Sequence, residues 1–252
     1  MKNIMNNTTL DFLLIYSILG IICQEIHKLF LINPRFFMIE VRDLSFVYSG
    51  NAPLFERLSF SVGDGELLML NAPSGRGKTT LMYCLCGIIP RNIKGEFVGS
   101  VSIDGKAVAD MTAAELPRAA AMVFQEPGSR IFLPAVEDEL AFTLENMCVP
   151  REKIRESIDC ALELTGLSGK RYENPANLSG GQLKLLALAS VLAFPPRVLL
   201  LDEITAGLDN SALDRVKYCV ELFKAQGCAV IVSDHNAQNT QIWGEDANEL
   251  GI

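Results

Sequence analysis

Three short apolar runs constrain the fold of this 252-residue chain more than any other feature. They occupy residues 67–70, 198–201 and 229–232, and each is followed by polar residues. Uninterrupted apolar runs of this length are typical of strands that are buried on both faces of a parallel sheet. Because the carboxyl ends of parallel strands share one edge, we expect the polar residues to meet there and to form a ligand site.

Other segments predict a second layer and a helical region. Residues 39–48 and 58–62 alternate apolar with polar side chains around a turn at residues 49–51, which predicts antiparallel strands. Asp104-Gly105 between two short runs predicts a hairpin. Residues 137–168 have apolar side chains at helical spacing. The pattern as a whole predicts an α/β fold.

Composition excludes several classes of protein. With 49% hydrophobic residues the chain can bury a large core, which rules out disordered and disulfide-dense classes. The 22 basic and 30 acidic residues leave a net charge of −8, so we expect no nucleic-acid partner that is held by phosphate neutralisation. Seven cysteines without a Cys-x-x-Cys pair favour a reduced, cytosolic chain.

Residues 1–37 form a hydrophobic N-terminal extension. Their apolar run, residues 12–23, is shorter than the roughly 20 residues that span a bilayer, and no signal-peptide cleavage pattern follows it. We interpret the extension as an appended segment outside the core function, with Met38 as an alternative start. The other interpretation is an amphiphilic anchor that lies on a membrane.

A glycine-rich segment, residues 72–79, follows the first apolar run and has the sequence Ala-Pro-Ser-Gly-Arg-Gly-Lys-Thr. Strand, glycine-rich turn and helix in this order predict a phosphate-binding P-loop. Gly75 and Gly77 let backbone N–H groups turn toward phosphate oxygens, Lys78 reaches the terminal phosphates, and Thr79 offers a hydroxyl to Mg²⁺. The pattern usually begins with glycine; Ala72 is costly there only if its φ is positive. The alternative is a strand–helix turn without a ligand.

Asp202 and Glu203 end the second apolar run. Beside a P-loop, Asp202 suits the Mg²⁺ shell, and Glu203 suits a group that orients or deprotonates an attacking water. The alternative is that these acids only cap a helix.

The most specific motif is Leu-Ser-Gly-Gly-Gln at residues 178–182. Together with the P-loop, the Asp202-Glu203 pair, Ala-Gly-Leu-Asp at residues 206–209 and a strand followed by His235, it makes residues 38–244 resemble the ATP-binding-cassette (ABC) ATPases. Residues 123–146 resemble the energy-coupling-factor and cobalt/nickel uptake branch. The resemblance implies a P-loop NTPase core with a parallel sheet, an antiparallel β layer and a helical signature subdomain at about residues 126–185.

The resemblance also implies roles for individual residues. Tyr48 would stack on adenine, Gln125 would sense Mg²⁺ and the water, and His235 would contact the γ-phosphate beside the catalytic Glu203. Asp209 would couple the two ATP sites of a dimer. The remaining nucleotide-binding positions form the P-loop of one subunit and the signature that completes the opposing subunit's site: Ser74, Gly75, Arg76, Gly77, Lys78, Thr79 and Thr80, then Ser179, Gly180, Gly181 and Gln182. Thr79, Gln125 and Asp202 would hold the metal.

One P-loop and one signature imply a homo- or heterodimer with a second ABC ATPase, and ATP and Mg²⁺ as cofactors. The branch implies an ATPase that energises a vitamin or metal importer from the cytoplasmic face of the membrane, with transmembrane subunits on other chains. Two alternatives stay open: a soluble, non-transport ABC ATPase, and a degenerate nucleotide-binding regulatory subunit. The transported substrate is not encoded visibly.

The chain departs from the family pattern at several places. Leu185 stands where a basic residue is usual, Arg130 where this branch often has glutamine, and Ile204 where proline is usual. Residues 236–252 contain no further apolar run, so we expect residues 245–252 to form a short, solvated acidic tail.

Overall fold

The computed structural model describes residues 39–73, 75–234, 241–243 and 248–251. All of them belong to one compact unit, Arg35–Ile252. The expected N-terminal extension, Met38, Ser74 and His235 lie outside the described residues. Among the helices that are described, none is long and apolar enough to cross a membrane.

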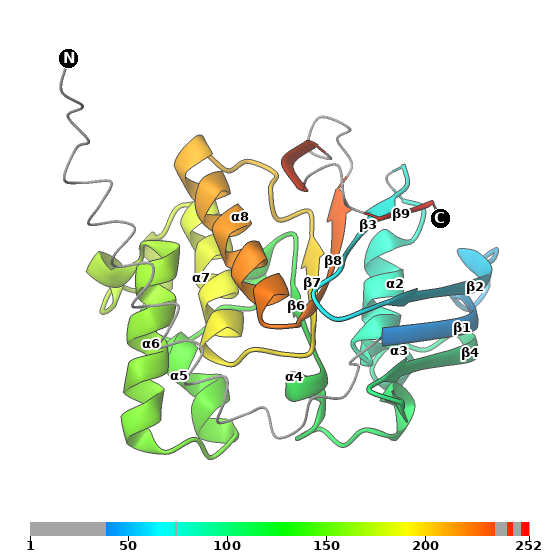
Figure 1. Cartoon of the computed structure of the whole chain (residues 1–252), viewed down its shortest axis with the longest axis horizontal. Coiled ribbons are helices and arrows are strands. Elements are labelled where there is room, and N and C mark those ends of the chain that lie inside the picture. The colour runs from blue at the N-terminus through cyan, green and yellow to red at the C-terminus, as the bar shows by residue number, and fades with distance from the viewer. Residues whose placement is uncertain (1–38, 74, 235–240, 244–247, 252) are drawn as a thin grey trace. The chain divides into compact units, whose positions relative to one another are not determined.

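A five-stranded parallel sheet lies at the centre of this unit (Figure 1). Its order is β6 (Ala120–Val123), β7 (Val198–Asp202), β8 (Ala229–Asp234), β3 (Leu67–Asn71) and β9 (Asn248–Gly251). The three apolar runs are the adjacent strands β7, β8 and β3, which confirms the prediction of a buried parallel sheet. Every residue of β7 and β8 is buried, because helices cover both faces.

Strand β9 differs from the sequence-based expectation that no strand follows residue 235. It pairs in parallel with β3, from Leu68 opposite Asn248 to Asn71 opposite Gly251. Its side chains are exposed or half-buried, as expected of an acidic segment. Sheet pairing uses backbone groups, so an edge strand needs no apolar run, and hydropathy does not reveal it.

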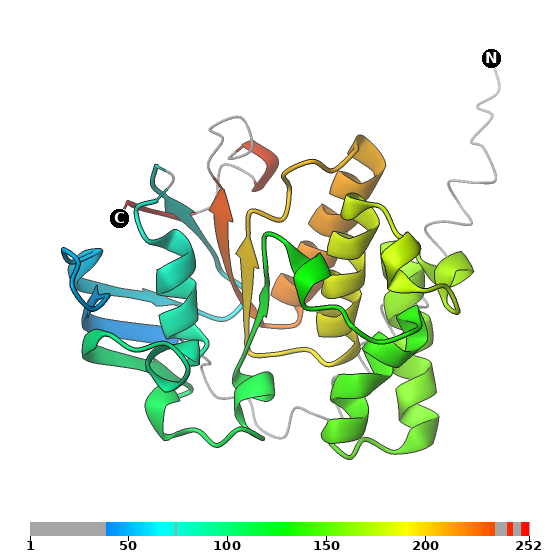
Figure 2. The ribbon, with the colours of Figure 1, turned by 180° about the vertical axis from the view of Figure 1, so that it is seen from behind.

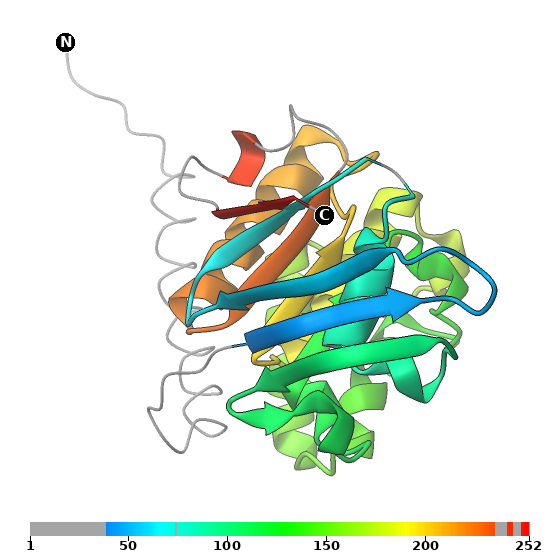
Figure 3. The same ribbon diagram turned by 90° about the vertical axis from the view of Figure 1, so that its right-hand side faces the viewer.

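A four-stranded antiparallel sheet forms the second layer, seen in front in Figure 3. Its order is β2 (Phe55–Val62), β1 (Ile39–Val47), β4 (Glu96–Ile103) and β5 (Lys106–Ala107). Asp104 and Gly105 both have positive φ, 53° and 76°, as a tight hairpin between β4 and β5 requires. The antiparallel layer and its hairpin are thus confirmed.

Helix α2 (Lys78–Leu85) lies between the two sheets (Figures 1 and 2). Its Leu81 and Met82 are fully buried in one apolar cluster with Phe46 of β1 and Leu200 of β7. This packing holds the start of α2, and therefore the P-loop, against the carboxyl ends of the parallel strands. The other short helices are α3 (Ile88–Arg91) and α4 (Leu116–Ala119).

The opposite face of the parallel sheet is covered by α7 (Gly180–Ala193) and α8 (Asn210–Ala225), as Figure 1 shows. The predicted helical region, residues 137–168, is two helices, α5 (Val136–Asn146) and α6 (Arg151–Thr165). Pro150 lies immediately before α6 and has no N–H for a continuing helix, so the apolar spacing does not run through as one element. Short 3₁₀ turns complete the fold: Val108–Asp110, Pro127–Ser129, Ser168–Lys170, Pro175–Asn177 and Gln241–Trp243.

Candidate functional site

The P-loop connects β3 to α2 at the carboxyl edge of the parallel sheet. Gly75 and Gly77 have φ of 80° and 96°, in the left-handed region that glycine adopts without strain. Gly77 is the N-cap of α2, and Lys78 is its first residue. The Lys78 ammonium is buried and donates to the carbonyl oxygens of Ala72, at 2.6 Å, and Pro73, at 3.4 Å. Lys78 therefore lies folded across the loop whose amides are expected to cradle phosphate.

Ala72, the departure at the first P-loop position, brings no backbone strain. It is buried, and it is not among the described residues with positive φ. A methyl group is tolerated here because the chain does not need the left-handed conformation that only glycine adopts cheaply.

Thr79 and Asp202 meet across the edge between α2 and β7. The Thr79 hydroxyl donates to Asp202 Oδ2 at 2.7 Å. The other carboxylate oxygen, Oδ1, accepts from the hydroxyl of Ser233 at the end of β8. Both Asp202 and Ser233 are buried, so the carboxylate is held from two sides. A hydroxyl oxygen next to a carboxylate oxygen suits Mg²⁺, which prefers hard oxygen ligands and keeps several waters.

Glu203 follows Asp202 in an unusual backbone conformation. Its φ is +48°, which costs a residue with a Cβ about 1 kcal/mol or more. Its N–H donates to Ser233 O at 3.1 Å and to Ser233 Oγ at 3.3 Å. Its carboxylate accepts a 2.6 Å hydrogen bond from Gln125 Nε2. The structure thus brings together the acid and the glutamine that the sequence identified 78 positions apart.

Tyr48 follows β1 and lies beside the same edge. Its hydroxyl is 3.1 Å from Thr80 Oγ1, and its ring packs edge-on against Phe46 with ring centroids 4.9 Å apart. Both contacts fix the ring, which is half-buried beside the P-loop helix. Arg76 is exposed at the tip of the loop.

The signature motif forms the N-terminus of α7. Ser179 is the N-cap: its hydroxyl accepts from Gln182 N at 3.3 Å, and its own N–H donates to Gln182 Oε1 at 2.9 Å. In the first turn that follows this reciprocal capping box, Gly180 is exposed and Gly181 is half-buried. Asp209 is the N-cap of α8, where its Oδ1 accepts from Ala212 N at 2.8 Å without a bond in return.

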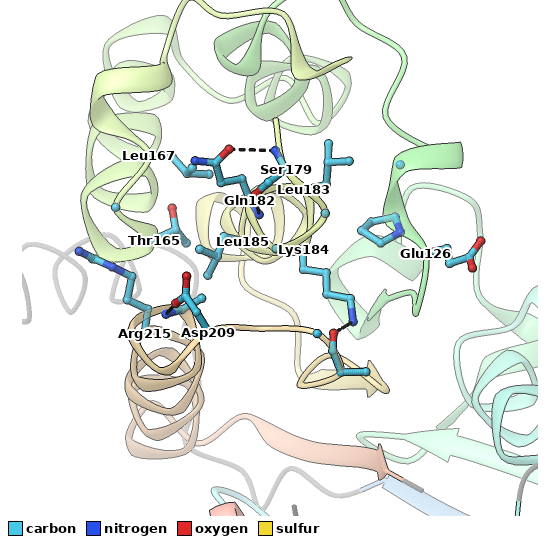
Figure 4. A pocket seen from close by; sticks show the side chains of 18 of the residues that line it. Glu126, Thr165, Leu167, Ser179, Gln182, Leu183, Lys184, Leu185, Asp209 and Arg215 are labelled. Atoms are coloured by element: carbon cyan, nitrogen blue, oxygen red, sulfur yellow. Dashed lines mark hydrogen bonds between the residues drawn. The ribbon is translucent and has the colours of Figure 1, made fainter. Parts of the chain in front are cut away.

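A cavity of about 880 Å³ lies in front of these two helix starts (Figure 4). Of the predicted site residues, Gln125, Ser179, Gly180, Gly181, Gln182 and Asp209 line it. None of the described P-loop residues does. The predicted site residues therefore fall into two groups: those that line this cavity, and those around the P-loop and the Asp202-Glu203 pair. Gln125 belongs to both, because it lines the cavity and also donates to Glu203.

Sequence reasoning missed three residues of this region. Ser233 is one of the polar residues that follow the third apolar run, and the sequence assigned no individual role to it. Lys184 donates to the carbonyl oxygen of Glu203. The sequence signal that could have identified it is that it is the single charged residue of the apolar helix α7. Arg215 lines the cavity from α8, and its Nη1 donates to Leu164 O at 3.4 Å. Arg130, where glutamine was expected, lies over the Phe124 ring at 3.6 Å, next to Gln125.

Comparison with known proteins agrees with this geometry. Residues 55–206 match the family model described as ABC transporter. A putative ABC transporter ATP-binding protein of Methanosarcina mazei is 38% identical over 200 residues, which are 79% of this chain and 34% of that protein. The energy-coupling factor transporter ATP-binding protein EcfA of Methanocaldococcus jannaschii is 33% identical over 211 residues, 83% of this chain and 74% of that protein.

A solved structure has the same fold. It is cbiO1 from Clostridium perfringens, described as part of the ABC transporter complex cbiONQ, with a TM-score of 0.68, 30% identity and coverage of 80% of each chain. The present chain spans about a third of the length of the Methanosarcina relative and about three quarters of the length of EcfA. The α/β P-loop NTPase fold is confirmed, and the chain belongs to the ABC transporter family of ATP-binding proteins.

Proposed function

We propose that this chain is the ATP-hydrolysing subunit of an energy-coupling-factor-like importer and works at the cytoplasmic face of the membrane. The observation that carries the proposal is the paired contact at one sheet edge: Thr79 with Asp202, and Gln125 with Glu203. A metal-binding pair adjacent to a carboxylate with an amide partner is the arrangement that phosphoryl transfer to water needs.

Each group has a defined task in this proposal. The P-loop amides and Lys78 bind the phosphates, and Thr79 and Asp202 hold Mg²⁺. The bound Mg²⁺ neutralises charge on the phosphate oxygens. Glu203 orients the attacking water and accepts its proton, while the Gln125 amide keeps the Glu203 carboxylate directed toward the phosphate side.

Dimerisation is supported by the separation of the two groups of residues. The signature turn lines a cavity to which the described P-loop residues contribute nothing. The glycines that line this cavity and the N-terminal amides of α7 are suited to bind a phosphate presented by a second ABC subunit, of the same or a related kind. ATP would then stabilise the closed dimer because it contacts both halves, and hydrolysis would release it.

Two findings weigh against a degenerate regulatory subunit. Ala72 causes no backbone strain in the P-loop, and β9 extends the parallel sheet beyond the point where the sequence suggested that it stops. The net charge of −8 weighs against a non-transport ABC ATPase that acts on nucleic acid. The relatives EcfA, an energy-coupling factor transporter protein, and cbiO1, part of an ABC transporter complex, favour transmembrane transporter subunits as partners of this chain.

The test is Glu203→Gln in the full chain, copurified from detergent-solubilised membranes with its partner chains. Glutamine keeps an acceptor for Gln125 Nε2 but cannot take a proton from water. We expect the variant to bind ATP, to lose hydrolysis by about 100-fold or more, and to accumulate as an ATP-bound dimer. The control is Glu56→Gln on the exposed face of β2, which should leave the rate unchanged.

Normal turnover in Glu203→Gln would refute the assignment of the catalytic acid. An inactive wild-type complex that still binds ATP would favour the regulatory alternative. A wild-type chain that hydrolyses ATP but never copurifies with membrane proteins would favour the non-transport alternative.

A further inference from the structure

Lys184 is a buried cation without a role in the site described so far. It lies in the second turn of α7, where it is the single charged residue of the helix, and its exposed fraction is 8%. Burying an ammonium group is unfavourable unless hydrogen bonds and opposite charges compensate the lost hydration. Burial lowers its pKa from the ordinary 10.5, while the carboxylates of Glu203 and Asp234 act in the opposite direction.

The contacts of Lys184 are both with the loop that joins β7 to α8. Its Nζ donates to Glu203 O at 3.0 Å and to Ala206 O at 2.7 Å, and Figure 4 shows the second of these bonds. The two carbonyls are three residues apart, so the ammonium spans the turn that leads from the acid toward Asp209. The ammonium is hydrogen-bonded to the backbone of Glu203, not to its carboxylate.

Glu203 is the residue in this loop that most needs to be held. Its positive φ is strained, and strained backbone persists only where the surroundings fix it on both sides. On the amino side, the Glu203 N–H is bonded to Ser233. On the carboxyl side, the Glu203 carbonyl is bonded to Lys184. The same carbonyl also accepts from Ala206 N at 3.3 Å, so Lys184 adds a side-chain restraint on the carboxyl side of Glu203, while the Gln125 amide restrains the carboxylate.

A second contact secures the same loop from β8. The Thr205 hydroxyl donates to Asp234 Oδ2 at 2.6 Å, and Asp234 is 4% exposed. Asp234 thus holds the loop at Thr205, while the Lys184 ammonium holds it at the carbonyls of Glu203 and Ala206. The Asp234 carboxylate also places negative charge near the ammonium. The family pattern has a basic residue at the position of Leu185; in this chain the cation lies one residue earlier and is turned toward the loop.

We propose that Lys184 is a positioning residue for ATP hydrolysis: it fixes the backbone of Glu203 in its left-handed conformation and ties the signature helix α7 to the catalytic loop. Ser179, at the N-cap of α7, lies only five residues before Lys184, so a displacement of the signature turn is transmitted to the carbonyls of Glu203 and Ala206. The inference rests on the proposed ATPase function.

The test compares Lys184→Met, which keeps the length and removes the ammonium, with Lys184→Arg, which keeps charge and donors. Lys153→Met on α6 is the matched control. For Lys184→Met we expect kcat to fall by about 10- to 100-fold, because a small misplacement of a catalytic group costs this much. The KM for ATP and the binding of a fluorescent ATP analogue should change by less than about threefold, because the hydrogen bonds of Lys184 go to Glu203 and Ala206 and not to a described P-loop residue. Lys184→Arg should recover at least about a third of the wild-type kcat.

A double variant separates positioning from general damage to the fold. In a Glu203→Gln background, adding Lys184→Met should lower the residual rate by less than about twofold, because both changes act through the same carboxylate. If Lys184→Met does not fold, Lys184→Gln, a neutral donor, is measured against the same expectations.

The inference is overturned if wild type is active and a folded Lys184→Met keeps its kcat, or if the losses in the double variant multiply. It is also overturned if kcat and KM worsen together in proportion to lost thermal stability. An inactive wild-type complex would instead overturn the proposed function, and the inference with it.

Discussion

Ser233→Ala is the substitution that tests most directly how the metal-binding pair is held. The Ser233 side chain is fully buried, and its hydroxyl donates to Asp202 Oδ1 while Thr79 donates to Oδ2. Alanine removes the first donor and nothing else of size. The Glu203 N–H keeps its 3.1 Å bond to Ser233 O and loses only the longer 3.3 Å bond to Ser233 Oγ, so the main loss falls on Asp202.

The expected magnitudes follow from the bond to Asp202. A hydrogen bond to a charged acceptor contributes about 1.5–3 kcal/mol, so the free energy of unfolding should fall by that amount. Loss of a hydrogen-bond partner behind a metal ligand weakens metal binding by about 10- to 100-fold, so the Mg²⁺ concentration for half-maximal ATPase activity should rise by that factor. Urea unfolding measures the first quantity, and a Mg²⁺ titration at fixed ATP measures the second.

Ser190→Ala is the matched control. The Ser190 hydroxyl donates to Leu186 O at 3.1 Å within α7, away from the metal-binding pair. It should lower stability by no more than about 1.5 kcal/mol and leave the Mg²⁺ dependence unchanged. If Ser233→Ala loses stability but keeps the wild-type Mg²⁺ dependence, then Asp202 does not need the serine for its orientation and the reasoning is wrong.

Two further predictions concern the fold. Arg171 donates two hydrogen bonds to Glu137, which lowers the pKa of this carboxyl from its ordinary 4.5; the pair therefore stabilises the fold fully above that pH and loses its effect as the pH falls through the lowered pKa. The difference in unfolding free energy between wild type and Glu137→Gln should thus shrink below pH 4.5 in urea titrations, and a constant difference would contradict it. Burial raises the pKa of the Cys228 thiol to about 12, whereas Cys148 is exposed. Mass spectrometry after thiol labelling at mildly alkaline pH should find Cys148 modified in the folded protein and Cys228 only after unfolding; the reverse order would refute the burial argument.

The local patterns of the sequence were sufficient to predict the central sheet and the antiparallel layer. An apolar run buried on both faces leaves little choice of environment, and a glycine-rich turn between a strand and a helix has few alternative uses. The hydropathy pattern did not predict β9, because the backbone alone makes the contacts of that strand. It also did not predict the break before α6, where one Pro interrupts a continuous helical spacing.

The candidate site was predictable in its residue types but not in its restraints. Motif spacing and phosphate chemistry predicted Thr79, Asp202 and Glu203, and the resemblance to the ABC ATPases added Gln125. Neither could predict that Ser233 holds the metal-binding carboxylate, since hydrogen bonds between distant segments depend on strand register.

The sequence by itself determined the fold class, the family and the chemistry at the sheet edge, because these follow from periodicity and from short motifs that are read within a few residues. Only the tertiary structure decided which groups hold Glu203 in a strained conformation and that a lysine of the signature helix is one of them. The physical reason is that burial and hydrogen bonding of a polar group are properties of the packed chain: the charge of Lys184 is visible in the sequence, but its two carbonyl partners, 19 and 22 residues away, exist only once α7 packs behind the end of β7.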